Sequence, residues 1–117
     1  MATSSVGTYL RFLRRKSGLS QEELARILGS VTPGQISRHE RSMSAPSLLA
    51  AFGYQVVFRQ PASDIFPGLY HAVEAGVEQR LAELESGLSS SDAKGRAAAH
   101  IARRLEWLWE RENPQIT

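Results

Sequence analysis

Polar and basic side chains with clear hydrogen-bonding chemistry lie just after the signal for a helix start in the first half of the chain. Thr32, Gln35 and Arg38 carry hydroxyl, amide and guanidinium groups, all of which donate hydrogen bonds. The guanidinium is a planar fork of donors that can form two parallel hydrogen bonds with the edge of a guanine base. These three side chains are therefore candidates for hydrogen-bonded contacts with a polar partner.

The sequence lacks the residue patterns that metal binding, disulfide formation or catalysis would need. The three histidines (His39, His71 and His100) are far apart, none has a second histidine at helical spacing, and cysteine is absent. We therefore expect no metal site, no disulfide and no cofactor. We also find no paired carboxylates, no nucleophile with a base and no phosphate-binding loop, so we do not expect an enzyme.

Positive charge is concentrated in the first part of the chain. Residues 1–67 have a net charge of +4, whereas residues 68–117 have a net charge of −2. This asymmetry favours polyanion binding by the first part, although ordinary solvated surface is the alternative. The N-terminal residues do not resemble a secretion signal, and no apolar run approaches the roughly 20 residues of a membrane span. We expect a cytoplasmic protein with no membrane partner, associated with the nucleoid when bound to DNA.

Two capping boxes predict a pair of short helices in the basic part. Ser20 and Thr32 are each followed three residues later by Glu23 or Gln35, and such pairs satisfy the free amides at a helix start. Gly29 is placed to end the first of these helices in a left-handed conformation. The sequence thus predicts two helices that begin near residues 20 and 32 and are joined by a tight turn.

Apolar spacing predicts further helices on both sides of this pair. One helix should end near residues 17–18, a fourth should begin at residues 45–46, and a short fifth should occupy residues 62–66. The fourth helix is apolar nearly all round, so we expect it to be central to the core. The residues expected to face the core are Val6, Leu10, Leu13, Leu24, Ile27, Leu28, Leu48, Leu49, Phe52, Val56 and Val57.

The remaining residues predict two longer helices. An apolar stripe runs from Leu69 to Leu88, and Asp92 is placed near the start of a last helix. The apolar residues expected on one stripe of the last helix are Ala97, Ile101, Leu105 and Leu108, with Trp107 and Trp109 at its edges. The expected fold is all-α, with five helices over residues 1–67 and a two-helix C-terminal extension over residues 68–117.

Residues 13–41 resemble the helix-turn-helix of the Cro and phage-repressor family, also described as XRE-like. The matching residues are Arg14, Gly18, Leu19, Ser20, Gln21, Leu24, Ala25, Gly29, Ile36, Ser37, Arg38, Glu40 and Arg41. The resemblance extends more loosely over residues 6–67. It implies a repressor-like domain whose third helix enters the major groove of a double-stranded DNA operator, in a transcriptional regulator that we expect to be a repressor.

The resemblance also assigns structural roles. Ala25 is small enough for a close helix crossing, and Ile36 helps to fix the angle between the two helices. Arg14 and Glu40 match positions that pair with each other in the family, so we expect an ion pair that braces the motif. His39 follows the recognition face at a position that is often bulky in the family, and we expect it to pack inside.

One departure from the family pattern affects the predicted contacts. The turn before Ile36 is one residue longer than usual, with Ser30 as the candidate insertion, and the usual base-reading positions are Pro33 and Gly34, which have no side-chain donor. Base contacts then fall to Thr32, Gln35 and Arg38, although Gln35 is equally suited to closing the capping box. The candidates for phosphate contacts are Gln21, Gly34, Ser37 and Arg41, through helix-start amides, close backbone approach or side-chain donors.

The C-terminal helices leave two interpretations open. The stripe from Leu69 to Leu88 either folds back on the first domain as extra core or forms the seam of a homodimer, which we favour. Trp107 and Trp109 are of the type enriched at interfaces. An alternative function is that of an antitoxin, which would bind a toxin through these helices and repress their shared operon.

Overall fold

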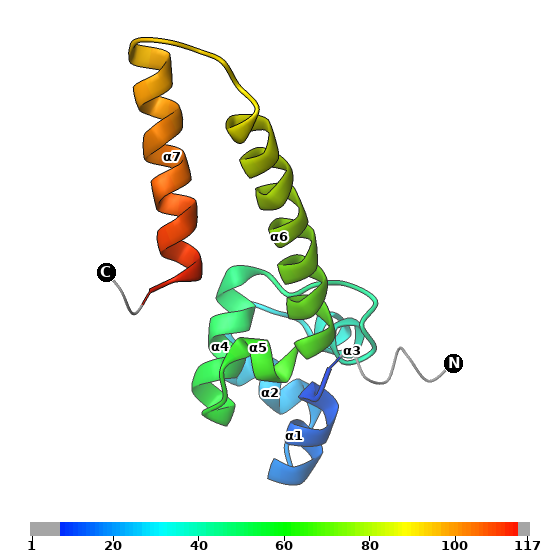
Figure 1. Ribbon diagram of the computed structural model, residues 1–117. Helices are drawn as coiled ribbons and strands as arrows, with labels where there is room; N and C mark the ends of the chain where they lie inside the picture. The colour runs from blue at the N-terminus through cyan, green and yellow to red at the C-terminus, as the bar shows by residue number, and fades with distance from the viewer. Residues whose placement is uncertain (1–7, 115–117) are drawn as a thin grey trace. The chain divides into compact units, whose positions relative to one another are not determined.

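The computed structural model describes residues 8–114, and all seven regular elements within them are helices (Figure 1). Their bounds are α1 Leu10–Ser17, α2 Gln21–Leu28, α3 Pro33–Glu40, α4 Leu48–Phe58, α5 Ala62–Ile65, α6 Pro67–Ser89 and α7 Arg96–Glu112. The predicted all-α fold with five helices followed by two longer ones is confirmed. Val6, which was expected on the first helix, lies outside the described residues.

The chain divides into two compact units, residues 1–73 and residues 74–117, so that the division falls within α6. The sequence placed the domain boundary after residue 67, where α6 begins. Each unit is described separately below.

Local sequence signals start and end the helices of the helix pair as expected. Ser20 Oγ accepts from the Glu23 amide at 3.0 Å, and the Glu23 carboxylate accepts from the Ser20 amide at 2.9 Å. Gly29 ends α2 in the left-handed region with φ 77°, and its amide donates to the Ala25 carbonyl at 2.9 Å. A glycine adopts this conformation without the steric cost that a Cβ would bring.

The core of the first unit lies where α1 to α5 meet. The buried residues that form it are Leu10, Leu24, Ala25, Ile36, Ala50, Tyr54, Ile65 and Phe66, with Leu13, Leu28 and Val57 among the partly buried residues packed against them. The predicted core positions Leu10 and Leu24 are thus confirmed. Ile27 was expected to face inward, but it is exposed, because α2 buries its other side against α3 and α4.

The orientation of α4 differs from the prediction. Its buried residues are Ala50 and Tyr54, whereas four residues expected in the core are exposed: Leu48, Leu49, Phe52 and Val56. The cause is close packing on α2, since a Cβ placed on Gly53 would lie only 2.4 Å from Leu28 Cδ2. The face around Gly53 therefore turns inward, and α4 presents an uncharged apolar face to solvent.

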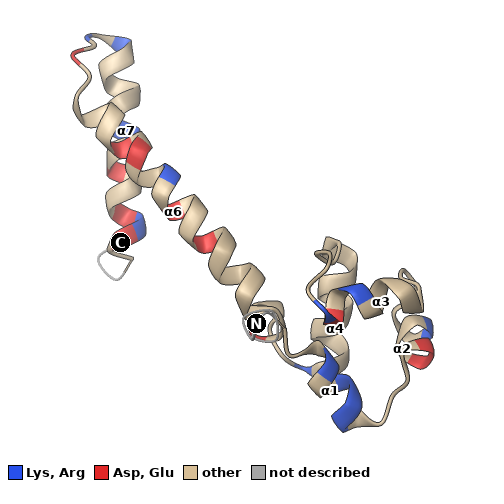
Figure 2. Ribbon diagram, turned by 90° about the vertical axis from the view of Figure 1, so that its right-hand side faces the viewer, with Lys and Arg blue, Asp and Glu red and all other residues tan. Residues whose placement is uncertain are grey.

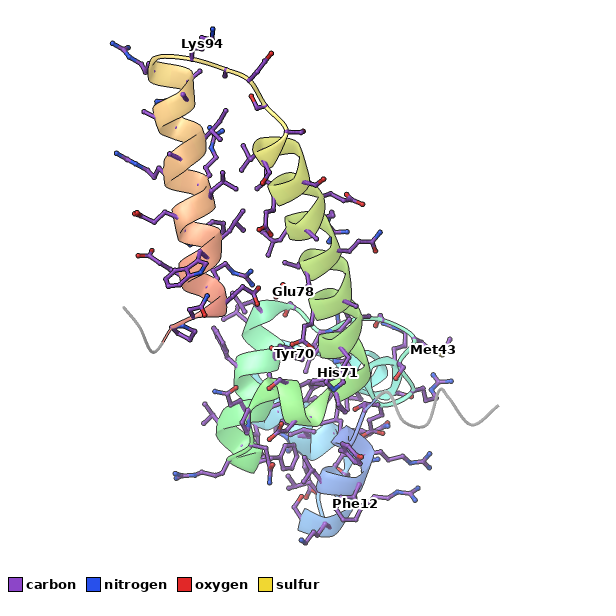
Figure 3. The ribbon with its side chains drawn as sticks, viewed as in Figure 1. Phe12, Met43, Tyr70, His71, Glu78 and Lys94 are labelled. Carbon is purple, nitrogen blue, oxygen red and sulfur yellow. The ribbon has the colours of Figure 1, made fainter. Side chains whose placement is uncertain are left out.

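The second unit contains the C-terminal part of α6 and α7, which run antiparallel and are joined by a loop that carries Lys94 (Figures 1 and 3). Leu108 is buried, and Arg111 Nη2 pairs with Glu78 Oε2 at 2.8 Å. Of the other residues expected on this stripe of α7, Ile101 and Leu105 are partly buried and Ala97 is exposed. Asp92 does not start α7, which begins at Arg96 after a glycine with positive φ.

No residue of α6 is buried, although the helix carries an apolar stripe along its length. The exposed apolar residues on it include Leu69, Val73, Val77 and Leu84. Leu81 and Leu88, which also belong to the stripe, are partly buried. None of the helices in residues 8–114 is both long and apolar enough to cross a membrane.

Candidate nucleic-acid interface

The candidate interface is built on α2, α3 and the four-residue turn between them. Ala25 and Ile36 are both buried at the crossing of the two helices, as expected from their size and spacing. Ser30 is exposed within the turn, whereas Val31 is partly buried against the core. The turn thus accommodates its residues without disturbing the packing of α3 on α2.

An ion pair holds α1 to the end of α3. The Arg14 guanidinium donates through Nε to Glu40 Oε2 and through Nη2 to Glu40 Oε1, the latter at 3.2 Å. Its Nη1 donates to the Leu19 carbonyl at 3.0 Å. The hydrogen bond with Glu40 raises the pKa of Arg14 above its ordinary value. The structure thus contains the brace between these two residues that the resemblance implied.

Gln21 takes part in the same network. Its Nε2 donates to Glu40 Oε1 at 3.1 Å, so the Gln21 side chain connects the start of α2 to the end of α3. A phosphate contact at this residue would therefore use the backbone amide, which lies in the first turn of α2. The sequence did not predict this role for the side chain.

The start of α3 brings the three candidate base-reading residues together. The Gln35 amide donates to Thr32 Oγ1 at 3.1 Å, and Gln35 Oε1 accepts from the Thr32 amide at 2.8 Å. Thr32, Gln35 and Arg38 are all exposed. In this arrangement Gln35 closes the capping box, which is one of the two roles that its position allowed.

The remaining candidates for phosphate contact lie along α3. Gly34 is exposed in the first turn, and Ser37 is partly exposed. Arg41 is exposed at the end of the helix, where its Nε donates to the Ser37 carbonyl at 3.3 Å. The guanidinium of Arg41 therefore lies beside the last turn of α3, with its charge exposed to solvent.

The interior side of α3 carries a contact that the sequence did not reveal. His39 is buried as expected, and its Nδ1 lies 2.8 Å from the hydroxyl of Tyr54 on α4, with the two rings at right angles. Burial, and secondly the charge of Arg38, lower the pKa of His39, while burial raises the pKa of Tyr54. The Tyr54 partner lies 15 residues away, beyond the range of local sequence patterns.

Basic residues occur on α1 as well as on α3 (Figure 2). Arg11, Arg15 and Lys16 are exposed on α1, where the Lys16 ammonium lies 5.9 Å from the ring centre of Phe12. Phe12 itself is largely exposed (Figure 3). The positive charge of the first part of the chain is therefore available at its surface.

Within residues 8–114, no three His, Asp or Glu side chains gather in a way that could hold a metal ion.

A family model described as helix-turn-helix matches residues 10–57, which extend from the start of α1 into the last turn of α4. Comparisons with curated proteins and with solved structures give no match.

Proposed function

We propose that this chain, whose residues 10–57 match the helix-turn-helix family model, is a DNA-binding transcription regulator that represses transcription by placing α3 in the major groove of an operator. The observation that carries the proposal is the exposed start of α3, held in place by buried contacts on its other side. Thr32 and Arg38 face solvent, whereas Ile36, His39 and Glu40 are buried. A helix presented in this way fits the major groove, where each base pair shows a distinct set of donors and acceptors.

Arg38 is the main base-reading residue in this proposal. Its guanidinium is exposed and can form a bidentate contact with guanine O6 and N7. Thr32 can also contact a base, because its hydroxyl can still donate a hydrogen bond while its oxygen accepts from the Gln35 amide. Gln35 contributes mainly by closing the capping box, since its carbonyl oxygen is already bound to the Thr32 amide.

Phosphate contacts would fix the register of α3 on the duplex. Arg41 is suited to a side-chain contact because its charge is exposed at the end of α3. The backbone amide at Gln21, the bare backbone at Gly34 and the Ser37 hydroxyl are the other groups that we assign to phosphates. Such contacts add affinity for any duplex sequence and weaken as salt concentration rises.

The test is selection of duplexes from a random-sequence library by the purified protein, followed by fluorescence anisotropy titration across salt concentrations. We expect one enriched motif, and we expect log affinity to fall with log salt at nearly one unit of slope per neutralised phosphate. Repression is tested separately with a reporter gene downstream of the selected duplex. Binding of equal strength to every duplex would contradict the proposal.

The apolar stripe of α6 supports a homodimer, since exposed apolar residues on one helix are typical of an interaction surface. A dimer would bind two half-sites about one helical turn, or 34 Å, apart. An antitoxin would use the same stripe for a toxin, and co-purification with the product of a neighbouring gene would favour that alternative. In either case we expect the protein in the cytoplasm, at the nucleoid.

A further inference from the structure

Arg38 and Gly34 are neighbours on the exposed side of α3. Gly34 precedes Arg38 by one helical turn, and long side chains in a helix lean toward its N-terminus. A Cβ atom placed on Gly34 would lie 3.9 Å from Arg38 Nη1 and 3.9 Å from Thr32 Oγ1. The guanidinium therefore lies next to the space that a side chain at position 34 would occupy.

The fold itself does not require a glycine at this position. Gly34 lies within α3, and it is not among the glycines with positive φ, in contrast to Gly18 and Gly29. A Cβ there would make only ordinary van der Waals contacts. Glycine is also among the poorest helix formers, so folding alone would favour another residue. Besides the proposed phosphate contact of its backbone, the neighbouring Arg38 is the group to which the absent side chain matters.

We propose that Gly34 is a specificity-determining residue that acts through Arg38. The missing side chain leaves room for the guanidinium at the leading edge of α3, next to Thr32, where it reaches a guanine of the operator. A larger residue at position 34 would compete for this space and turn the guanidinium away from the base. The inference rests on the proposed function, because it concerns how the same helix reads DNA.

The rival explanation is that Gly34 is needed only because its own backbone approaches a phosphate, with no effect through Arg38. The two explanations differ in what a substitution does when Arg38 is absent. If Gly34 acts through Arg38, Gly34→Leu no longer changes the discrimination between bases in an Arg38→Ala background. If the DNA itself needs the space, Gly34→Leu weakens binding equally in both backgrounds.

The experiment measures the affinity ratio between the selected duplex and a duplex in which the guanine pair read by Arg38 is replaced. We expect Gly34→Leu to reduce this ratio by about tenfold and Arg38→Ala to reduce it similarly, since one bidentate contact is worth roughly that discrimination. The double variant should be within about twofold of Arg38→Ala. Gly34→Ala should reduce this ratio less than Gly34→Leu does. Ser30→Leu is the matched control, because it adds the same apolar side chain in the exposed turn.

A second readout does not use DNA. In the nuclear magnetic resonance spectra of the free protein, we expect a nuclear Overhauser effect between the Arg38 guanidinium protons and the Gly34 Hα protons. The absence of this contact in the wild type, or an equal effect of Gly34→Leu in both backgrounds, would overturn the inference and leave the regulator proposal intact. Failure of the wild type to select any duplex sequence would overturn both.

Discussion

The Nδ1 atom of His39 lies 2.8 Å from the hydroxyl of Tyr54, and both side chains are buried between α3 and α4. Tyr54 also packs against Phe66, at 5.6 Å between ring centres. The helix α3 is therefore attached to the centre of the core by a polar contact on its inner side. His39 follows Arg38 directly in α3, so the contact holds the helix beside the residue that we propose to read a base.

Tyr54→Phe is expected to lower the free energy of unfolding by about 1–3 kcal/mol, because it leaves a buried nitrogen of His39 without a hydrogen-bond partner. Urea denaturation monitored by circular dichroism measures this change. Tyr70→Phe is a matched control at a half-exposed tyrosine, where we expect a change within about 0.5 kcal/mol. Equal stabilities of the two variants would show that the hydrogen bond does not hold α3.

The lowered pKa of His39 predicts that stability decreases in mild acid. The unfolded chain binds this proton with a pKa near the ordinary 6.5, whereas the folded protein binds it only at lower pH. Below about pH 6.5 the unfolded state takes up the proton first, so the free energy of unfolding falls until the folded-state pKa is passed. Urea denaturation from about pH 7.5 to pH 5 should show this loss, and the loss should be smaller in His39→Gln.

The brace between Arg14 and Glu40 predicts strong coupling between two substitutions. The side chains are only 11% and 3% exposed, so Arg14→Met leaves a nearly buried carboxylate without its main partner and should cost about 3–5 kcal/mol. The double variant Arg14→Met with Glu40→Leu removes both charges and should cost less than the two single variants added together. Additive losses in urea denaturation would argue against the brace.

Local signals in the sequence predicted the parts of the site that depend on neighbouring residues. The capping boxes at Ser20 and Thr32, and the left-handed Gly29, are formed within a few residues, so the sequence is sufficient to locate them. The pair of Arg14 and Glu40 spans 26 residues and was predicted only through the family resemblance. Without that resemblance, no spacing rule would have joined these two side chains.

The orientation of α4 was not predictable in the same way. Its sequence from Leu48 to Phe58 has no charged residue, so the apolar pattern does not distinguish an inner face from an outer one. Packing sets the orientation of α4, because Gly53 allows Leu28 to approach closely and the Tyr54 hydroxyl contacts His39 Nδ1. Both contacts lie between helices and become visible only when the chain is folded.

Arg38 and Arg41 are expected to respond differently to replacement by alanine. Arg38→Ala should cost on the order of 1–3 kcal/mol on the selected duplex and relax discrimination at one base pair. Arg41→Ala should weaken binding to all duplexes by a similar factor and reduce the salt slope by about one unit. Anisotropy titrations with single-base-pair variants measure both effects. A uniform loss for Arg38→Ala would reassign this residue to a phosphate.

The stripe on α6 predicts the oligomeric state. Val77 and Leu84 are seven residues apart, on the same face of the helix, and each is at least 40% exposed. If this face joins two copies, the wild type should sediment as a dimer at equilibrium, and the double variant Val77→Arg with Leu84→Arg should sediment as a monomer. Burying two charges in such an apolar contact is unfavourable, whereas Gln79→Arg adds a charge about 200° around the helix and should leave the dimer intact.

The same variants connect assembly to DNA binding. A monomer engages one half-site, so the double variant should lose most of its affinity for a duplex with two half-sites and keep its weaker affinity for a single one. Footprints of the wild type should then show two protected segments about one helical turn apart, and the variant should lose this pattern. The opposite outcome is a wild type that sediments as a monomer and gains solubility or stability only when it is co-expressed with a neighbouring gene product. The α6 stripe would then be assigned to a toxin, because that partner would cover the exposed apolar residues.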